Sequence, residues 1–169
     1  MTIIEKFLGQ CVDIPDHLHY DIKQGLWAKA GDNTLVFGFT QPAIVLSGGI
    51  KDMDPLVDQS HRVSRGQSIL FVITGKILYL EAPVDGDIIF NKRVVDDPSG
   101  IAADPYDKGW LFSIKTEKSA DQLLEYLASA EDYFQSLRNS EGLKNPEGLK
   151  GGVSGICKAV YTGIGGQKI

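Results

Sequence analysis

The stretch from Ile69 to Gly86, ILFVITGKILYLEAPVDG, decides the fold. Two runs of apolar, β-branched or aromatic residues, Ile69–Ile73 and Ile77–Leu80, lie on either side of the short centre Thr74-Gly75-Lys76. Runs of this composition separated by a short glycine-containing break predict a β-hairpin. The hairpin places a lysine at its tip, where an exposed side chain suits covalent attachment better than core packing.

The sequence on both sides of this hairpin predicts more strands. Residues 20–22 and 26–30 have strand composition, and the turn Gly31-Asp32-Asn33 leads into a further strand at residues 34–40, so these runs form a second hairpin. Short strands are also expected at residues 87–91, continued by Arg93-Val94-Val95, and at residues 110–115. Many short strands with glycine turns predict a mainly β (α+β) fold.

The other segments are expected to be helical or irregular. Apolar residues between positions 3 and 8 predict a short amphipathic helical turn, and a second helical turn within residues 41–50 ends at Gly48-Gly49. Lys51–Ser60 is polar and predicts a surface loop. Ser119 and Gln122 fit a capping box, which one or two amphipathic helices follow as far as residue 137. We expect one domain at residues 1–138 and a glycine-rich tail at residues 139–169.

Composition narrows the classes of partner. The chain has 169 residues and a formal net charge of −5, which argues against a general nucleic-acid binder, since such proteins neutralise phosphates. No apolar run reaches the length of a membrane span, and the first residues do not resemble a signal peptide. The expected location is therefore cytoplasmic, away from membranes, with Cys11 and Cys157 as free thiols.

Few residues suggest chemistry outside the hairpin. His17 and His19 are spaced to share one face of a strand, but no carboxylate–cysteine set lies nearby to complete a ligand group, so they are better explained as surface residues and no metal site is expected. Cys157 precedes a lysine and has a weaker alternative role as a reactive thiol. No nucleophile–base pair is apparent, and no catalytic residue is therefore assigned.

A resemblance to a known family emerges from several motifs in order. Asp104-Pro-Tyr-Asp-Lys-Gly-Trp-Leu111 strongly resembles the closing signature of the glycine cleavage system H protein family. Val36–Thr40 is similar to the family's VGIT strand, Val63–Gln67 to its V-x-K-G-E motif, and Ala82–Gly86 to its S-P-V-x-G motif. The resemblance spans residues 20–137. It implies a barrel-sandwich hybrid of two small sheets with a C-terminal helix, the fold of lipoyl and biotinyl carriers.

The resemblance also implies a function and a site. Members of this family carry lipoate on a lysine and shuttle an aminomethyl group and electrons between the enzymes of glycine cleavage. The implied partners are those or related lipoate-dependent enzymes and the enzyme that attaches lipoate. In the family the modified lysine lies eight residues before the proline of S-P-V-x-G, and eight positions before Pro83 is Gly75. Lys76, one residue later, is the candidate attachment site.

Two other differences between this sequence and the family's motifs leave a second function open. The acidic residue usual three places before the lysine corresponds to Val72, and the family's early H-E-W motif is replaced by Gln24-Gly25-Leu26. The alternative hypothesis is therefore an H-like binding or scaffold protein that carries no lipoate. Under either hypothesis the ungapped count places Leu78 and Leu80 on the inward-facing side of the returning strand.

Overall fold

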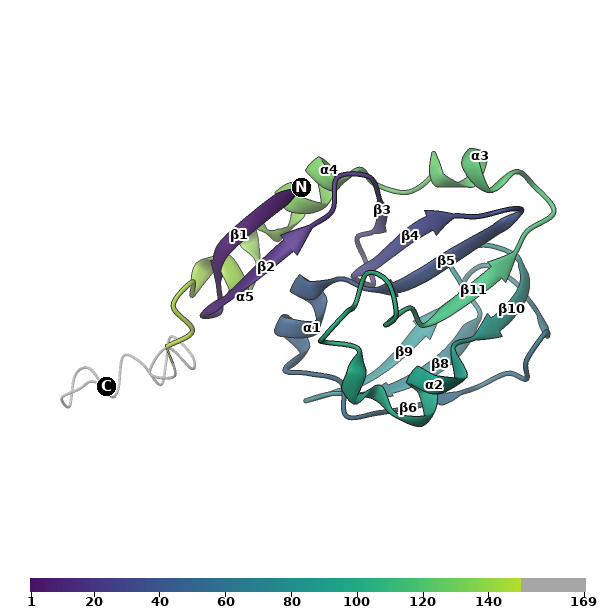
Figure 1. The fold of residues 1–169 in the computed structure, drawn as a ribbon, viewed down its shortest axis with the longest axis horizontal. Coiled ribbons are helices and arrows are strands. Elements are labelled where there is room, and N and C mark those ends of the chain that lie inside the picture. Colours follow the sequence, from purple (N-terminus) through teal and green to yellow (C-terminus); the bar gives the residue numbers. More distant parts are fainter. Residues whose placement is uncertain (150–169) are drawn as a thin grey trace.

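The computed structural model describes residues 1–149, and Figure 1 shows their arrangement. The strands are β1 Thr2–Phe7, β2 Gln10–Ile14, β3 His19–Asp21, β4 Leu26–Ala30, β5 Thr34–Phe39, β6 Asp52–Pro55, β7 Arg62–Val63, β8 Ser68–Ile73, β9 Ile77–Glu81, β10 Gly86–Phe90 and β11 Phe112–Lys115. The α-helices are α1 Gln41–Ser47, α2 Lys92–Asp96, α3 Ala120–Leu124, α4 Ala130–Ser136 and α5 Glu141–Lys144, with short 3-10 turns at Pro98–Gly100 and Leu137–Asn139.

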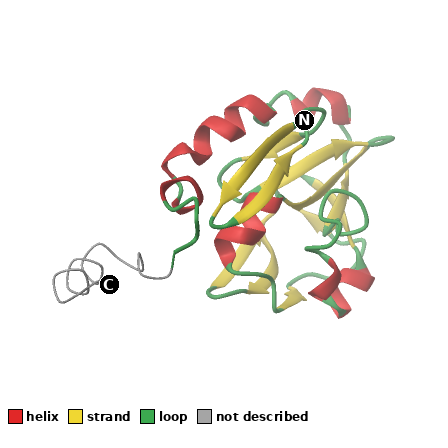
Figure 2. Ribbon diagram, turned by 60° about the vertical axis from the view of Figure 1, so that its left-hand side comes forward, coloured by secondary structure: helices red, strands yellow, loops and turns green. Residues whose placement is uncertain are grey.

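Two sheets enclose the main core. The larger has six strands in the order β3-β4-β5-β11-β10-β7, and the smaller has three in the order β6-β8-β9. Buried side chains from both sheets form one hydrophobic cluster, including Phe37 and Phe112 from the larger sheet and Leu70 and Val72 from the smaller. Figure 2 shows mostly strands with a few short helices, so the predicted mainly β class is confirmed.

The two hairpins predicted from glycine turns are present. β4 and β5 pair antiparallel around residues 31–33, and β8 and β9 pair with Val72 opposite Leu78 and Leu70 opposite Leu80. Leu80 is buried and Leu78 is partly buried against the core, which confirms the inward register expected for both residues.

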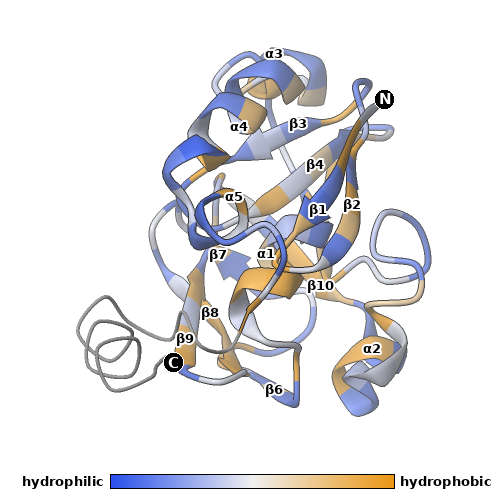
Figure 3. Cartoon of the chain, turned by 90° about the vertical axis from the view of Figure 1, so that its left-hand side faces the viewer, coloured by the Kyte–Doolittle hydropathy of each residue, from blue (hydrophilic) through white to orange (hydrophobic). Residues whose placement is uncertain are grey.

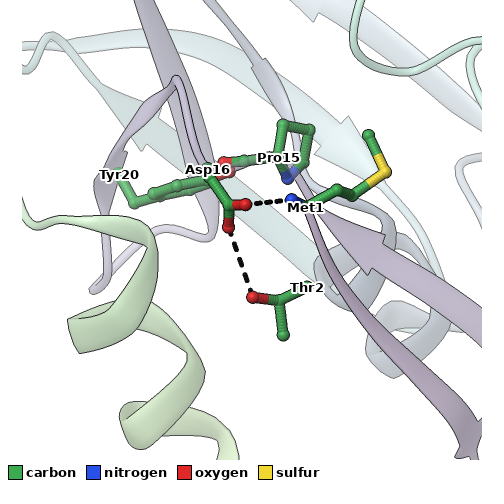
Figure 4. A network of polar contacts seen from close by, with 5 residues as sticks. All are labelled: Met1, Thr2, Pro15, Asp16 and Tyr20. Atoms are coloured by element: carbon green, nitrogen blue, oxygen red, sulfur yellow. Dashed lines mark hydrogen bonds and ion pairs between the residues drawn. The ribbon is translucent and has the colours of Figure 1, made fainter.

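The N-terminal segment differs from the prediction of a helical turn. Residues 2–14 form the hairpin β1–β2, whose turn contains Leu8 and Gly9 with φ values of 49° and 78°. A second hydrophobic cluster forms beneath it from Ile4, Phe7, Val12, Ile14, Leu18, Tyr20, Trp27, Ala130, Tyr133 and Leu137. Asp16, just after the hairpin, accepts hydrogen bonds from the Met1 amino group and the Thr2 hydroxyl (Figure 4).

Helix α5 closes this second cluster. Gly142 lies so close to the Phe7 ring that a Cβ would overlap the ring, and the Leu8 N–H donates to the Gly142 carbonyl over 3.2 Å. Lys6 forms an ion pair with Glu147 at 2.7 Å. Residues 140–149, which the sequence assigned to the tail, therefore pack on the N-terminal hairpin; the rest of the predicted tail lies outside the described residues.

Three further local predictions are wrong. Part of Lys51–Ser60 is not a loop, because β6 pairs with β8 through Met53, whose side chain is buried in the core. The segment Arg93–Val95 does not continue β10 but lies in α2, which buries Val94. Ser119 occupies the N-cap position of α3, but its side chain makes no capping hydrogen bond.

Candidate functional site

The tip of the β8–β9 hairpin is a three-residue turn. Ile73 pairs with Ile77, so Thr74, Gly75 and Lys76 connect the strands and Gly75 is the central residue. The Thr74 N–H donates to the Lys76 carbonyl over 2.8 Å, and the Thr74 hydroxyl accepts from the Lys76 N–H over 3.0 Å. Thr74 is 5 % exposed, whereas Gly75 and Lys76 are exposed. The turn is therefore fixed from within by the threonine, and its central and last residues face solvent.

Helix α1 supports the tip from the inner side. The Gly75 N–H donates to the Ser47 carbonyl over 3.2 Å at the C-terminal end of this helix. The helix begins where the Thr40 hydroxyl caps the Ala43 N–H, and it ends at Gly48, whose left-handed backbone returns N–H bonds to the last carbonyls. Because both ends of α1 are capped, the Ser47 carbonyl is a fixed acceptor for the turn.

Gln24 holds the other end of the returning strand. β9 is an edge strand, and the Gln24 side-chain amide pairs with its backbone at Glu81, accepting from the N–H over 2.7 Å and donating to the carbonyl over 3.1 Å. The Asp21 carboxylate orients this amide, accepting from Nε2 over 2.8 Å. The amide thus completes the hydrogen bonding that a neighbouring strand would supply at this edge.

A groove with a volume of about 670 Å³ runs beside the hairpin. Its walls come from the loop at residues 22–25, from α1, from the hairpin at residues 74–81 and from the helical segment at residues 133–140. Lys76 borders it together with Leu78 and Leu46, which supply apolar surface, and Lys23 borders it from the opposite loop. Among residues 1–149, the Lys76 ammonium makes no ion pair or hydrogen bond, so its side chain is available to a modifying enzyme.

Buried tyrosines anchor the far wall of the groove. Tyr133 lines the groove, stacks on Tyr20 with ring centroids 4.8 Å apart, and shares a 2.5 Å hydrogen bond with the Thr40 hydroxyl. Burial raises the pKa of Tyr133 to about 12, and it also raises the pKa values of Tyr20 and Tyr106. The Tyr106 hydroxyl accepts from the Gln41 N–H over 3.0 Å and donates to the Asp13 carbonyl over 2.6 Å. The Tyr106 hydroxyl therefore joins α1 to the N-terminal hairpin, and the Tyr133 hydroxyl joins the Thr40 cap of α1 to α4.

The structure brings Lys76 and Gly75 together with Gln24 and α1, but it does not bring the other candidates there. His19 lies on β3 and His17 precedes it, and no cluster of three potential metal ligands occurs within residues 1–149. Cys11 is an exposed free thiol on β2, and Cys157 lies outside the described residues. Within the described part of the chain, no helix is both long enough and apolar enough to span a bilayer.

The pairing of Gln24 with β9 and the bond from Gly75 to α1 were missed by sequence reasoning. Both join segments far apart in the chain, and neither residue type signals its partner. The one available hint is that Gln24 stands where the family has the histidine of its H-E-W motif.

Comparisons with known proteins agree on one family. The sequence profile of the glycine cleavage H-protein matches residues 18–140. The glycine cleavage system H protein of Bifidobacterium longum is 32% identical over 129 residues, which cover 75% of this chain and 90% of that protein. The corresponding protein of Thermobifida fusca is 32% identical over 134 residues, covering 78% of this chain and 100% of the relative.

A solved structure extends the agreement to the fold. The crystal structure of a glycine cleavage system H protein from Mycobacterium marinum superposes with a TM-score of 0.60 at 29% identity, covering 72% of this chain and 97% of that one. The predicted fold of that family is therefore confirmed for the two main sheets. The chain belongs to the glycine cleavage H-protein family.

Proposed function

We propose that this protein is a lipoyl carrier of glycine cleavage, with no catalytic activity of its own, and that lipoate is attached to Lys76. Family membership supports the carrier role, and the exposed amine of Lys76 at the hairpin tip supports the site. Lys76 is the single lysine between residues 68 and 81, so the hairpin offers no other amine. Bound lipoate would supply a dithiolane that accepts and releases an aminomethyl group and a pair of electrons.

The groove suits such a group. A lipoyl arm joins an apolar chain and a dithiolane to the lysine through one amide, and the groove beside Lys76 combines apolar side chains with polar ones from Gln24 and Ser47. The Thr74 hydroxyl and the Ser47 carbonyl fix the turn, so the base of the arm starts from a constant position. This matters because attachment needs the amine presented in one geometry to the modifying enzyme.

Gly75 distinguishes this chain from the family pattern. The resemblance places the lysine at the central position of the turn, and this chain has a glycine there. Lys76 follows it, two residues before Leu78, so the alternation of side chains along the strand places Lys76 on the same side of the hairpin as Leu78 and Leu80. We propose that Lys76 still serves, because its exposed side chain lies at the strand end and borders the groove. The proposal includes the partners of the family, which are the glycine cleavage enzymes and a lipoylating enzyme. It also includes a carrier domain at residues 1–138 followed by a segment at residues 139–169, of which residues 140–149 pack on the N-terminal hairpin.

Intact-mass measurement tests the proposal. The protein is expressed with a lipoate ligase and lipoic acid beside an ordinary glycine cleavage H protein, and we expect a mass increase of one lipoyl amide that peptide mapping assigns to Lys76. Lys76→Ala should abolish the increase, whereas Lys23→Ala, which removes the other groove lysine, should retain it. An unmodified wild-type protein beside a modified control would refute the carrier role and leave the alternative of an unmodified binding or scaffold protein.

A further inference from the structure

The outer face of the smaller sheet carries two parallel rows of side chains. Across β6, β8 and β9, Asp54 pairs with Phe71 and Phe71 with Tyr79, and the neighbouring row is Asp52, Ile73 and Ile77. Directly paired residues share a face, and residues two apart on one strand share it as well. The opposite face carries Met53, Leu70, Val72 and Leu80 of the core. All six residues of the two rows therefore lie on the face that points away from the core.

Four of these residues form an apolar surface, which we call the outer patch: Phe71, Ile73, Ile77 and Tyr79. Ile77 is 61% exposed and Tyr79 is 59% exposed, while Phe71 and Ile73 are partly exposed. The rings of Phe71 and Tyr79 lie 5.4 Å apart at 60°. Figure 3 shows β8 and β9 side by side in hydrophobic colours. Scattered apolar residues are ordinary on a surface, but a contiguous group of them marks an interaction site.

The outer patch adjoins the proposed attachment site. Ile73 and Ile77 form the last pair before the turn, so Ile77 directly follows Lys76. The inner side of the turn is occupied by α1, because the Gly75 N–H bonds to the Ser47 carbonyl. An enzyme that takes Lys76 into its active site must therefore cover the hairpin end from the outer side or from the groove.

Charge indicates what kind of surface fits the patch. Asp52 and Asp54 are exposed along β6, form a border on one side of the patch, and make no ion pair within residues 1–149. The two rows hold no lysine or arginine. Face-to-face pairing of two copies of the chain would remove four aspartates from water without a matching cation on the face. A partner with an apolar strip bordered by lysine or arginine matches both features.

We propose that the enzyme that acylates Lys76 docks on the outer patch, with basic side chains facing Asp52 and Asp54. This inference rests on the proposed function, because it assigns a docking surface to the attachment reaction. In that reaction the Lys76 Nζ attacks the carbonyl carbon of a lipoyl adenylate. The amide C–N bond forms, the C–O bond to AMP breaks, and the amine loses a proton.

Steady-state kinetics of an ATP-dependent lipoate ligase, with this protein as the varied substrate, test the docking surface. For Ile77→Ser/Tyr79→Ser we expect the KM to rise about tenfold or more while kcat stays within about twofold, since docking rather than chemistry is weakened. Asp52→Asn/Asp54→Asn should raise the KM at low salt and flatten its dependence on ionic strength. Ile89→Ser is the matched control, because Ile89 is an exposed strand residue of the larger sheet, and its KM should equal that of the wild type.

Binding without chemistry supplies a second measurement. Without ATP no acyl group is transferred, so the ligase can be titrated calorimetrically with the unmodified wild type; Ile77→Ser alone should give a weaker Kd than the wild type, and Ile89→Ser should give the same Kd. Thermal melting confirms that each variant is folded. If the wild type is modified at Lys76 and the patch variants keep the wild-type KM and Kd, the docking surface is wrong and the carrier role stands. If the wild type is never modified, the carrier role fails and this inference fails with it.

Discussion

Gly75→Lys combined with Lys76→Ala moves the amine of the hairpin tip to the central position of the turn. The backbone of Gly75 is outside the left-handed region, so a side chain is not strained there. A Cβ at this position would have the Ser47 carbonyl oxygen at 3.4 Å as its nearest neighbour, which is an ordinary van der Waals contact. The hydrogen bonds that fix the turn use only the Thr74 side chain and the backbone, so both substitutions retain them.

These contacts allow the change in the free energy of unfolding to be estimated. Replacing a glycine at a compatible backbone position stabilises a protein by about 0.4–1 kcal/mol, because the unfolded chain loses freedom. The contact with the Ser47 carbonyl adds no strain, so the free energy of unfolding should change by less than about 1 kcal/mol. For a chain of this size that corresponds to a shift in Tm of at most about 4 °C.

The assay is lipoylation followed by intact mass and peptide mapping, with Tm measured on the same samples. We expect the double variant to be modified at position 75 at least as completely as the wild type at Lys76, and Lys76→Ala alone to stay unmodified. A double variant that melts normally but remains unmodified, under conditions that modify the wild type, would refute the reasoning that the central position of the turn is the family's attachment point. A loss of more than about 10 °C in Tm would instead refute the steric argument about Ser47.

Three further predictions concern the supports of the site. Gln24→Ala removes both side-chain hydrogen bonds to β9, so we expect the free energy of unfolding to fall by about 1–3 kcal/mol. Hydrogen exchange at the Glu81 amide should become faster, and unchanged exchange there would contradict the role assigned to Gln24. Gly142→Ala drives a Cβ into the Phe7 ring, so overpacking should lower the free energy of unfolding by about 1–3 kcal/mol and make residues 1–14 sensitive to protease. Gly100→Ala is the control, because a Cβ there meets open space, and it should change neither measurement. Burial raises the pKa of Tyr133 to about 12, so above pH about 10 this tyrosine loses its proton in the unfolded protein before it does so in the folded protein. Denaturant titrations should therefore show the free energy of unfolding falling from pH 10 to pH 12. Tyr133→Phe should make that fall shallower, and an equal slope in both proteins would refute the assignment.

Local patterns were sufficient for much of the main fold. The β8–β9 and β4–β5 hairpins follow from β-branched runs around short turns, and α1 follows from apolar residues that end at Gly48. Each of these signals lies within about 15 residues, so the local sequence alone determines the element. The motifs at residues 82–86 and 104–111 then identify the family, and with it the arrangement of the two sheets.

The N-terminal hairpin shows why other elements were missed. Its turn requires a positive φ at Leu8, and leucine gives no sign of that conformation. The spacing of Ile3, Ile4 and Phe7 suits a helix equally well, and a bulge between Ile4 and Phe7 removes the strict alternation of a strand. The hairpin also depends on a contact that is remote in the sequence, because Gly142, more than 100 positions away, lacks a side chain and so leaves room for the Phe7 ring. Similarly, β6 exposes its aspartates and is recognisable only by pairing with β8.

The same non-local contacts connect the segments outside the family match to the candidate site. The profile of the family begins at residue 18, yet the hairpin at residues 2–14 contacts α1 through the Tyr106 hydroxyl, which joins the Asp13 carbonyl to the Gln41 N–H at the start of that helix. The other end of α1 holds the Gly75 N–H at the tip of the β8–β9 hairpin. One capped helix of two turns therefore separates the N-terminal hairpin from the turn that presents Lys76. The contacts at Gln41 and at Ser47 thus lie at opposite ends of one helix that is capped at both ends. The N-terminal hairpin, which α5 holds through the bond from the Leu8 N–H to the Gly142 carbonyl, is therefore joined to the turn that carries Lys76 through α1, although neither of them borders the tip.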